Sequence, residues 1–219
     1  KEKISRLKVM DADGENAKTI TEVAGSIFSP TWSPDGNRIA YSVQRDKSHP
    51  VIYIQNVSGG GATPLTPFPG SNLSPSFSPD GSKILFSSSF EGSADIYEMS
   101  ASGGQPRRLT NWPSSEVQPS YAPDGKSFVF VSDRAGFNKP RIYRYEFGSG
   151  RTTQVSNSGY ATSPQFSSDG SQIAFLSGRS AAIMNSSGAI TANLGATGID
   201  EAPSFSPNGK RVVFASKQG

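Results

Sequence analysis

Few side chains in this sequence are of types that catalyse reactions, and those few are widely separated. The single histidine, His49, lies in the polar stretch QRDKSHP, where we expect a solvated loop position rather than a general base. No Gly-x-Ser-x-Gly phrase supplies a serine nucleophile, and no glycine-rich phosphate-binding phrase occurs. Cysteine is absent, which excludes thiolate chemistry and disulfides. The sequence therefore predicts a protein that is not an enzyme.

One cluster of carboxylates could be mistaken for a calcium loop. Asp11, Asp13 and Glu15 in DADGEN have the alternating spacing of calcium ligands. Glycine stands at the fourth position of this segment, however, whereas a calcium loop of this kind needs glycine at the sixth for its sharp turn. The segment is therefore expected to form an ordinary turn.

Composition and charge narrow the class of protein further. The 21 lysines and arginines exceed the 18 aspartates and glutamates by only three, which gives no support for binding nucleic acid. No run of 18 apolar residues occurs, so a membrane-spanning helix is excluded. The 23 glycines and 16 prolines favour turns over long helices. We expect many short strands and an all-β fold.

A repeated phrase organises these strands. An aromatic residue and a closing glycine recur at fixed spacing in WSPDG (32–36), FSPDG (77–81), YAPDG (121–125), FSSDG (166–170) and FSPNG (205–209). A proline stands two residues before each of these aromatic residues, at Pro30, Pro75, Pro119, Pro164 and Pro203. The closing glycines are 45, 44, 45 and 39 residues apart, close to the period of a four-stranded propeller blade. Each phrase suits a type I turn, and the β-branched and aromatic run after it predicts a buried strand. Trp32, Trp112 and the phenylalanines are expected mainly in the core between blades.

The repeats predict one β-propeller domain over residues 1–219. A second hairpin with a glycine-rich turn completes each unit. The expected order is a second hairpin at 4–21, complete units at 27–66, 72–110, 117–156 and 162–194, and a final first hairpin at 201–216. In a closed ring, the N-terminal strands would complete the blade that the C-terminal strands begin, leaving no exposed edge.

Several phrases resemble the C-terminal propeller of the TolB family of the bacterial Tol-Pal envelope system. The resemblance rests on SPTWSPDGNRIAYSV, LSPSFSPDGSKILFSS, SDRAGFNKPRIYRY and EAPSFSPNGKRVVFAS, and it covers essentially the whole chain. The family implies six four-stranded blades after a smaller α/β domain, whereas this sequence offers five blade equivalents and nothing typical of that domain. We therefore expect either a truncated six-blade propeller or a ring that closes with five blades.

The resemblance also implies a function and a site. Members are non-enzymatic scaffolds in the periplasm of Gram-negative bacteria. We expect this chain to be a monomer that neither binds nucleic acid nor inserts into a membrane. Family members bind the lipoprotein Pal at the mouth of the propeller tunnel, act with other Tol proteins and are exploited by colicins. Family contacts lie just before the proline of successive blades. The partner-binding residues implied here are Phe28, Ser29, Ser71, Asn72, Ser74, Val117, Gln118, Thr162, Ser163, Asp200 and Glu201.

Asp200 and Glu201 carry a second expectation. They precede the first strand of their unit, where the innermost strands of a propeller reach the tunnel, so the paired carboxylates could attract a cation. Similar propellers can hold calcium there. No cofactor is otherwise required.

Two other functions remain open at this level. The repeat phrase also occurs in the non-catalytic propellers of prolyl-oligopeptidase-like peptidases, which would gate substrate access to a hydrolase domain outside this chain. A sugar-binding or cell-surface propeller would instead present exposed aromatic side chains at the tunnel and would not bind Pal.

Overall fold

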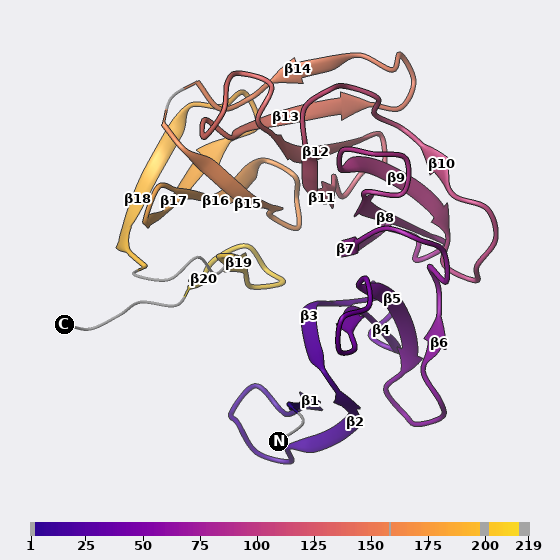
Figure 1. Cartoon of the computed structure of the whole chain (residues 1–219). Helices are drawn as coiled ribbons and strands as arrows, with labels where there is room; N and C mark the ends of the chain where they lie inside the picture. The colour runs from indigo at the N-terminus through magenta and orange to yellow at the C-terminus, as the bar shows by residue number, and fades with distance from the viewer. Residues whose placement is uncertain (1–2, 158, 198–201, 215–219) are drawn as a thin grey trace. The chain divides into compact units, whose positions relative to one another are not determined.

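The structure is a computed structural model that describes residues 3–157, 159–197 and 202–214, and every regular element in these ranges is a β-strand (Figure 1). The chain divides into two compact units, Lys1–Thr110 and Asn111–Gly219. The first unit contains β1 (Ile4–Val9), β2 (Lys18–Ala24), β3 (Ser26–Trp32), β4 (Arg38–Gln44), β5 (Val51–Asn56), β6 (Thr63–Pro64), β7 (Asn72–Phe77), β8 (Lys83–Ser88), β9 (Asp95–Ser100) and β10 (Arg107–Arg108). The second contains β11 (Glu116–Tyr121), β12 (Ser127–Ser132), β13 (Arg141–Glu146), β14 (Thr152–Gln154), β15 (Ala161–Phe166), β16 (Gln172–Ser177), β17 (Ser180–Asn185), β18 (Ile190–Ala196), β19 (Ser204–Phe205) and β20 (Val212–Val213).

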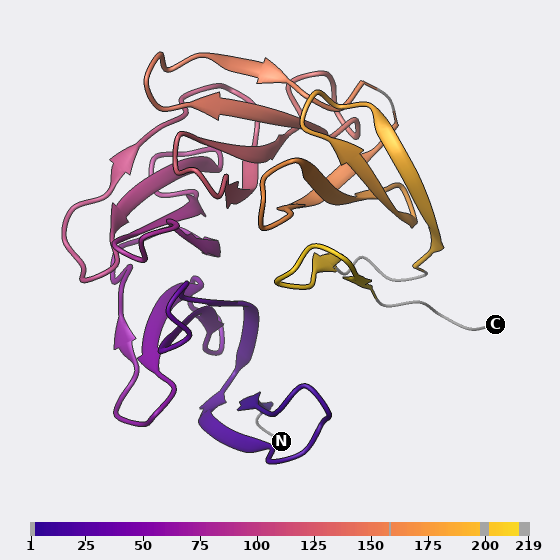
Figure 2. The same ribbon diagram turned by 180° about the vertical axis from the view of Figure 1, so that it is seen from behind.

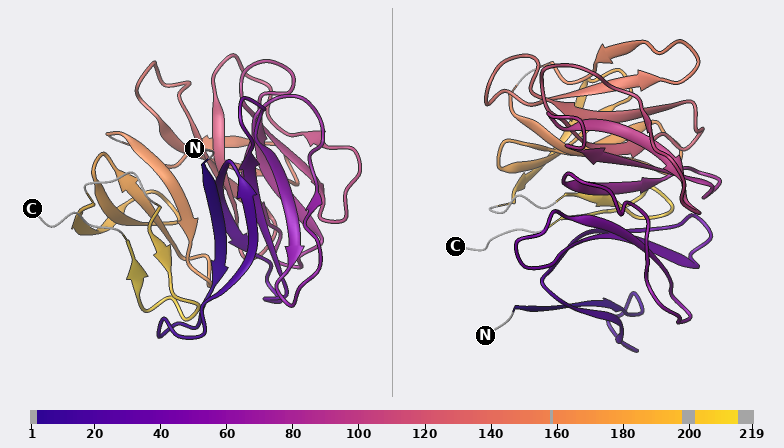
Figure 3. Two further views of the ribbon diagram at one scale, coloured as in Figure 1. Left: turned by 60° about the horizontal axis from the view of Figure 1, so that its bottom comes forward. Right: turned by 45° about the vertical axis from the view of Figure 1, so that its right-hand side comes forward.

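Each unit consists of antiparallel sheets in which consecutive strands are neighbours. The first unit has the two-stranded sheet β1-β2 and the four-stranded sheets β3-β4-β5-β6 and β7-β8-β9-β10. The second has the four-stranded sheets β11-β12-β13-β14 and β15-β16-β17-β18 and the two-stranded sheet β19-β20. Figure 2 shows β15 to β18 side by side, and Figure 3 shows how strongly the sheets twist. These are the four-stranded sheets that the repeat period predicts.

The repeated phrases form the turns between the first and second strands. In all five copies the amide of the closing glycine donates to the carbonyl three residues earlier, as from Gly36 to Ser33 (2.9 Å). The Ser33 hydroxyl also accepts the Arg38 amide and donates to Asp35. Asp80 and Asp169 occupy the same position as Asp35, and hydrogen bonds from Ser78 and Ser167 lower the pKa of each carboxyl to about 2.

The second strands form the core of both units, as their sequence predicts. Tyr41 and Phe86 in the first unit and Phe130 and Phe175 in the second are at most 2% exposed. In the first unit Phe86 stacks on Tyr97 of β9 at 5.8 Å. Burial of side chains of this size is the main source of stability in such sheets.

Trp32 is an exception, since the core prediction was wrong for this side chain, which is 48% exposed. Its equivalent in the next sheet, Phe77, is covered by the Arg38 guanidinium of β4, 5.5 Å from the ring centroid. The sheet that precedes Trp32 in its unit has two strands only, β1 and β2, and so provides no counterpart of β4 to cover the indole.

Candidate functional site

The first strand of every four-stranded sheet carries a β-bulge at the same place. In β3 the pairing with β4 passes from Phe28–Ser42 to Thr31–Ala40, so that Ser29 and Pro30 together face Tyr41. β7, β11 and β15 repeat this interruption. The residue before the proline has a left-handed backbone in each case, with φ of 48° at Ser29, 54° at Ser74, 53° at Gln118 and 55° at Ser163. Non-glycine residues rarely adopt this conformation, and bulges of this kind redirect side chains near functional sites.

Within the second unit, two of these bulges are joined by hydrogen bonds. The Ser163 amide donates to Gln118 Oε1 (2.9 Å), and Gln118 Nε2 donates to the Ser163 hydroxyl (3.2 Å). These bonds link β11 to β15 and fix two innermost strands relative to each other. Ser163 is 7% exposed, so its amide depends on Gln118 as an acceptor.

An open cleft of about 330 Å³ lies beside this link in the second unit. Its lining includes the apolar side chains of Val117 and Val131 and two exposed aromatic side chains, Phe137 (88% exposed) and Tyr160 (48%). The full lining is Ser115, Val117, Gln118, Val131, Asp133, Phe137, Asn138, Pro140, Tyr160 and Thr162. Large apolar side chains with a polar surround are typical of a protein-docking surface.

The loop that carries Phe137 is anchored at its beginning. The Arg134 guanidinium lies 3.8 Å from the Trp112 ring centroid and 4.3 Å from that of Tyr143. Burial lowers the pKa of Arg134, and the charge of Glu116, 3.8 Å away, opposes this shift. One residue earlier, Asp133 Oδ1 accepts the amide of Ser115 (2.9 Å). Phe137 is therefore exposed on a loop whose base is held by packing and hydrogen bonds.

The structure brings only some of the predicted partner-binding residues into this cleft. Val117, Gln118 and Thr162 line it, and Ser163 is attached to it through Gln118. The other predicted residues that the structure describes, Phe28, Ser29, Ser71, Asn72 and Ser74, belong to the first unit. Asp200 and Glu201 lie outside the described residues, so their contacts and the calcium site predicted for them remain predictions.

In the first unit the predicted residues differ in exposure. Phe28 is 38% exposed, whereas Asn72 is completely buried. The Asn72 amide group donates to the carbonyls of Gly70 (2.9 Å) and Pro50 (3.3 Å). Asn72 thus fixes the backbone before β7 and presents no side chain to a partner.

Phe137, Tyr160 and Asp133 were missed by the sequence argument. They lie in loops whose conformation the repeat pattern does not define. Their positions in the sequence could have indicated them. Asp133 and Phe137 lie within SDRAGFNKPRIYRY, and Tyr160 directly precedes the first strand of a sheet.

The remaining candidates for chemistry fall where the sequence predicts. His49 is exposed in the loop between β4 and β5. Asp11 and Gly14 form a turn through the Gly14 amide and the Asp11 carbonyl (2.9 Å), and Glu22, later in the same hairpin, pairs with Arg6. In the part of the chain that the structure describes, no three side chains of metal-ligating type are grouped. No helix in those ranges is long and apolar enough to cross a membrane.

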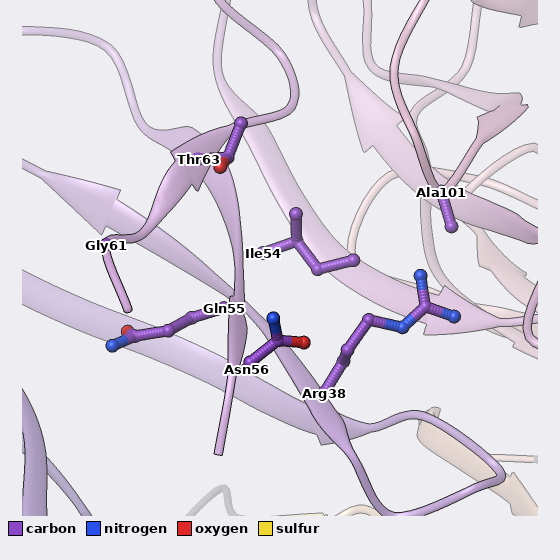
Figure 4. A pocket seen from close by; sticks show the side chains of 7 residues that line it. All are labelled: Arg38, Ile54, Gln55, Asn56, Gly61, Thr63 and Ala101. Atoms are coloured by element: carbon purple, nitrogen blue, oxygen red, sulfur yellow. The ribbon is translucent and has the colours of Figure 1, made fainter. Parts of the chain in front are cut away.

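A second hollow lies in the first unit and is more polar (Figure 4). The Arg38 side chain borders it and donates to the carbonyl of Gly81 (2.8 Å), while Gln55 donates to the carbonyls of Ile20 and Gly60. The side chains of Arg38 and Gln55 are therefore used within the protein, which favours a structural role for these two residues. The full lining is Arg38, Ile54, Gln55, Asn56, Gly61, Thr63 and Ala101.

Four-stranded antiparallel sheets with sequential pairing and a repeated buried second strand define the class of all-β propellers. Comparison with solved structures agrees: TolB from Acinetobacter baumannii matches with a TM-score of 0.86 and 41% identity over 98% of this chain. The family model described as the TolB beta propeller domain matches residues 1–219, and the chain belongs to this family. A relative from Nitrosomonas europaea, named Tol-Pal system protein TolB, is 48% identical over 52 residues, or 24% of this chain.

The chain covers about half of the matched structure and less of the curated relative. It spans 54% of the A. baumannii chain, and the aligned segment spans 12% of the N. europaea protein. A puromycin-hydrolyzing peptidase of Mycobacterium tuberculosis also matches, with a TM-score of 0.65 and 14% identity over 84% of this chain and 31% of that chain. At this identity the peptidase shows a shared fold alone.

Proposed function

We propose that this chain is a non-enzymatic, periplasmic interaction scaffold of the Tol-Pal envelope system that binds the lipoprotein Pal. Membership of the TolB β-propeller domain family and the relatives named Tol-Pal system protein support this assignment. The structural observation that carries it is the cleft lined in part by Gln118, where the aromatic side chains of Phe137 and Tyr160 are exposed together with apolar and neutral polar lining residues. Exposed aromatic side chains in clefts are the residues that most often dominate binding energy.

The proposed Pal contacts are the exposed or partly exposed residues at the bulges of each unit and in the cleft. They are Val117, Gln118 and Thr162 in the second unit and Phe28, Ser29, Ser71 and Ser74 in the first. Asn72 and Ser163 act by fixing the backbone, and Asp200 and Glu201 are proposed to contact Pal and to bind calcium. Other Tol proteins are proposed as further partners, and colicins are proposed to exploit the contact with Pal at the mouth of the tunnel.

The experiment that tests this function is calorimetric titration of the chain with purified Pal, with and without calcium. Micromolar or tighter binding is the expected result. Val117→Arg is the test variant, because a long cation at this partly exposed position in the lining of the cleft would block docking without removing a hydrogen bond that the structure contains. Thr153→Arg on the exposed outer strand β14 is the matched control.

Two results would refute the proposal. One is no heat of binding between Pal and the wild-type chain. The other is equal loss of affinity in the β14 control and the Val117 variant, which would mean that the added charge acts without regard to position. A change in affinity with calcium would support the proposed metal site, and an unchanged affinity would count against a calcium-linked surface.

A further inference from the structure

The cleft of the second unit has a chemistry more specific than that of an apolar docking surface. Two aromatic side chains, Phe137 and Tyr160, stand on its sides, and Asp133 is the single charged residue among the described residues that line it. Aromatic faces attract cations through their quadrupole, and a carboxylate beside them adds a direct charge interaction. Neutral donors and acceptors from Gln118, Asn138 and Ser115 complete the lining.

We infer that this cleft receives a basic side chain, an arginine or lysine, from a surface loop of the partner protein. The inference rests on the proposed function, since it names what the Pal-binding surface recognises. The alkyl part of such a side chain would contact Val117 and Val131, and its charged end would lie against the aromatic rings and Asp133. Long basic side chains combine these two properties.

The carboxylate is held in place before a partner arrives. Asp133 Oδ1 accepts the Ser115 amide, and the next residue, Arg134, is packed between Trp112 and Tyr143. The guanidinium of Arg134 therefore packs against these aromatic rings and is not among the residues that line the cleft. Asp133 itself is only partly buried, so a partner's cation can approach it.

The walls of the cleft are anchored in a similar way. The Ala161 amide donates to the Pro140 carbonyl (3.0 Å), which joins the start of β15 to the end of the Phe137 loop. The Gly178 amide donates to the Tyr160 carbonyl (2.7 Å). These bonds hold the backbone on both sides of the cleft, which reduces the conformational entropy that the backbone loses when the cleft is occupied.

The test has two independent parts. In the first, Nα-acetyl-arginine amide and its neutral near-isostere Nα-acetyl-citrulline amide are titrated separately into the isotopically labelled chain, and amide chemical shifts are recorded. The arginine compound is expected to shift the resonances of Asp133, Phe137 and Tyr160, and the citrulline compound is expected to shift them much less. Equal shifts with the two compounds, or no shifts in the cleft, would overturn the inference.

The second part measures the affinity for Pal of two variants. Asp133→Asn keeps the acceptor for the Ser115 amide but removes the charge, and it is expected to weaken binding about two- to five-fold and to reduce its dependence on salt. Phe137→Ala is expected to weaken binding by about five-fold or more. The controls are Asp46→Asn, in an exposed loop of the first unit, and Ile190→Ala, at an exposed apolar position of β18.

The outcomes separate this inference from the proposed function. If Pal binds the wild-type chain and both cleft variants with affinities within about two-fold of one another, the inference fails and the function stands. If Pal does not bind but the arginine compound shifts the cleft, the function fails and a cation-binding cleft stands. If both cleft variants lose affinity for Pal and neither control does, the result supports both the proposed function and the inference.

Discussion

The hydrogen bonds between Gln118 and Ser163 should measurably stabilise the second unit. Gln118→Met preserves the length of the side chain but removes both its acceptor and its donor. The Ser163 amide and hydroxyl, in a residue only 7% exposed, then lose their partners. Leaving a buried amide without an acceptor costs about 1–3 kcal/mol, so the free energy of unfolding should fall by about that amount.

The assay is urea unfolding followed by tryptophan fluorescence in a Trp32→Phe background. The chain contains two tryptophans, so the signal then comes from Trp112 in the second unit. Gln118→Glu is the matched control, because its carboxylate can still accept from the Ser163 amide and hydroxyl, and it should be less destabilising than the methionine variant. The reasoning is refuted if Gln118→Met changes stability by less than about 0.5 kcal/mol, or if the glutamate variant loses as much.

Two further predictions concern the stability of the protein at low pH and the space around two glycines. Because hydrogen bonding lowers the pKa of Asp80 to about 2 from 3.8, the stabilisation that its charge provides is present above pH 4 and is lost as the pH falls towards 2. The melting temperature of the wild type should therefore fall as the pH is lowered over this range, and that of Asp80→Asn should fall less. Parallel curves of melting temperature against pH for the two proteins would contradict the lowered pKa of Asp80. Gly188→Ala should be far more destabilising than Gly103→Ala in thermal unfolding, although both glycines have a left-handed backbone (φ 94° and 100°). An added Cβ at Gly188 would lie within 2 Å of the Val155 carbonyl oxygen, whereas at Gly103 it would meet nothing within 4 Å, so equal effects would refute the packing described.

The parts of the fold that recur in sequence could be predicted from it. Proline, aspartate and glycine limit the backbone directly, so that SPDG at Ser33–Gly36 and its equivalents specify the turns without help from the rest of the protein. The buried aromatic residues follow from alternation, because Tyr41 and Phe86 lie on the inward face of their strands. Trp32 shows the limit of this argument, since its exposure depends on what the neighbouring sheet contains.

The site could be predicted only in part. The family resemblance points to the residues before the prolines as partner contacts, which stays a prediction, and the sequence does not reveal the bulge or the left-handed backbone of Ser29, Ser74 and Gln118. A proline favours an extended backbone at the residue before it. The bulged pairing with the second strand instead places these residues in the left-handed conformation, so the local preference predicts the wrong backbone. The pairing of Gln118 with Ser163 depends on which sheets become neighbours, and the exposure of Phe137 depends on how its loop is anchored through Arg134.

Binding of Pal through the cleft of the second unit, as proposed, can be tested by amide hydrogen exchange of the chain with and without a saturating concentration of Pal. This measurement reports both whether Pal binds and where it binds. Slower exchange is expected in residues 115–118, 133–140 and 160–162, with little change in the outer strand β14. Unchanged exchange throughout the chain, or protection confined to segments away from the cleft, would contradict the proposal.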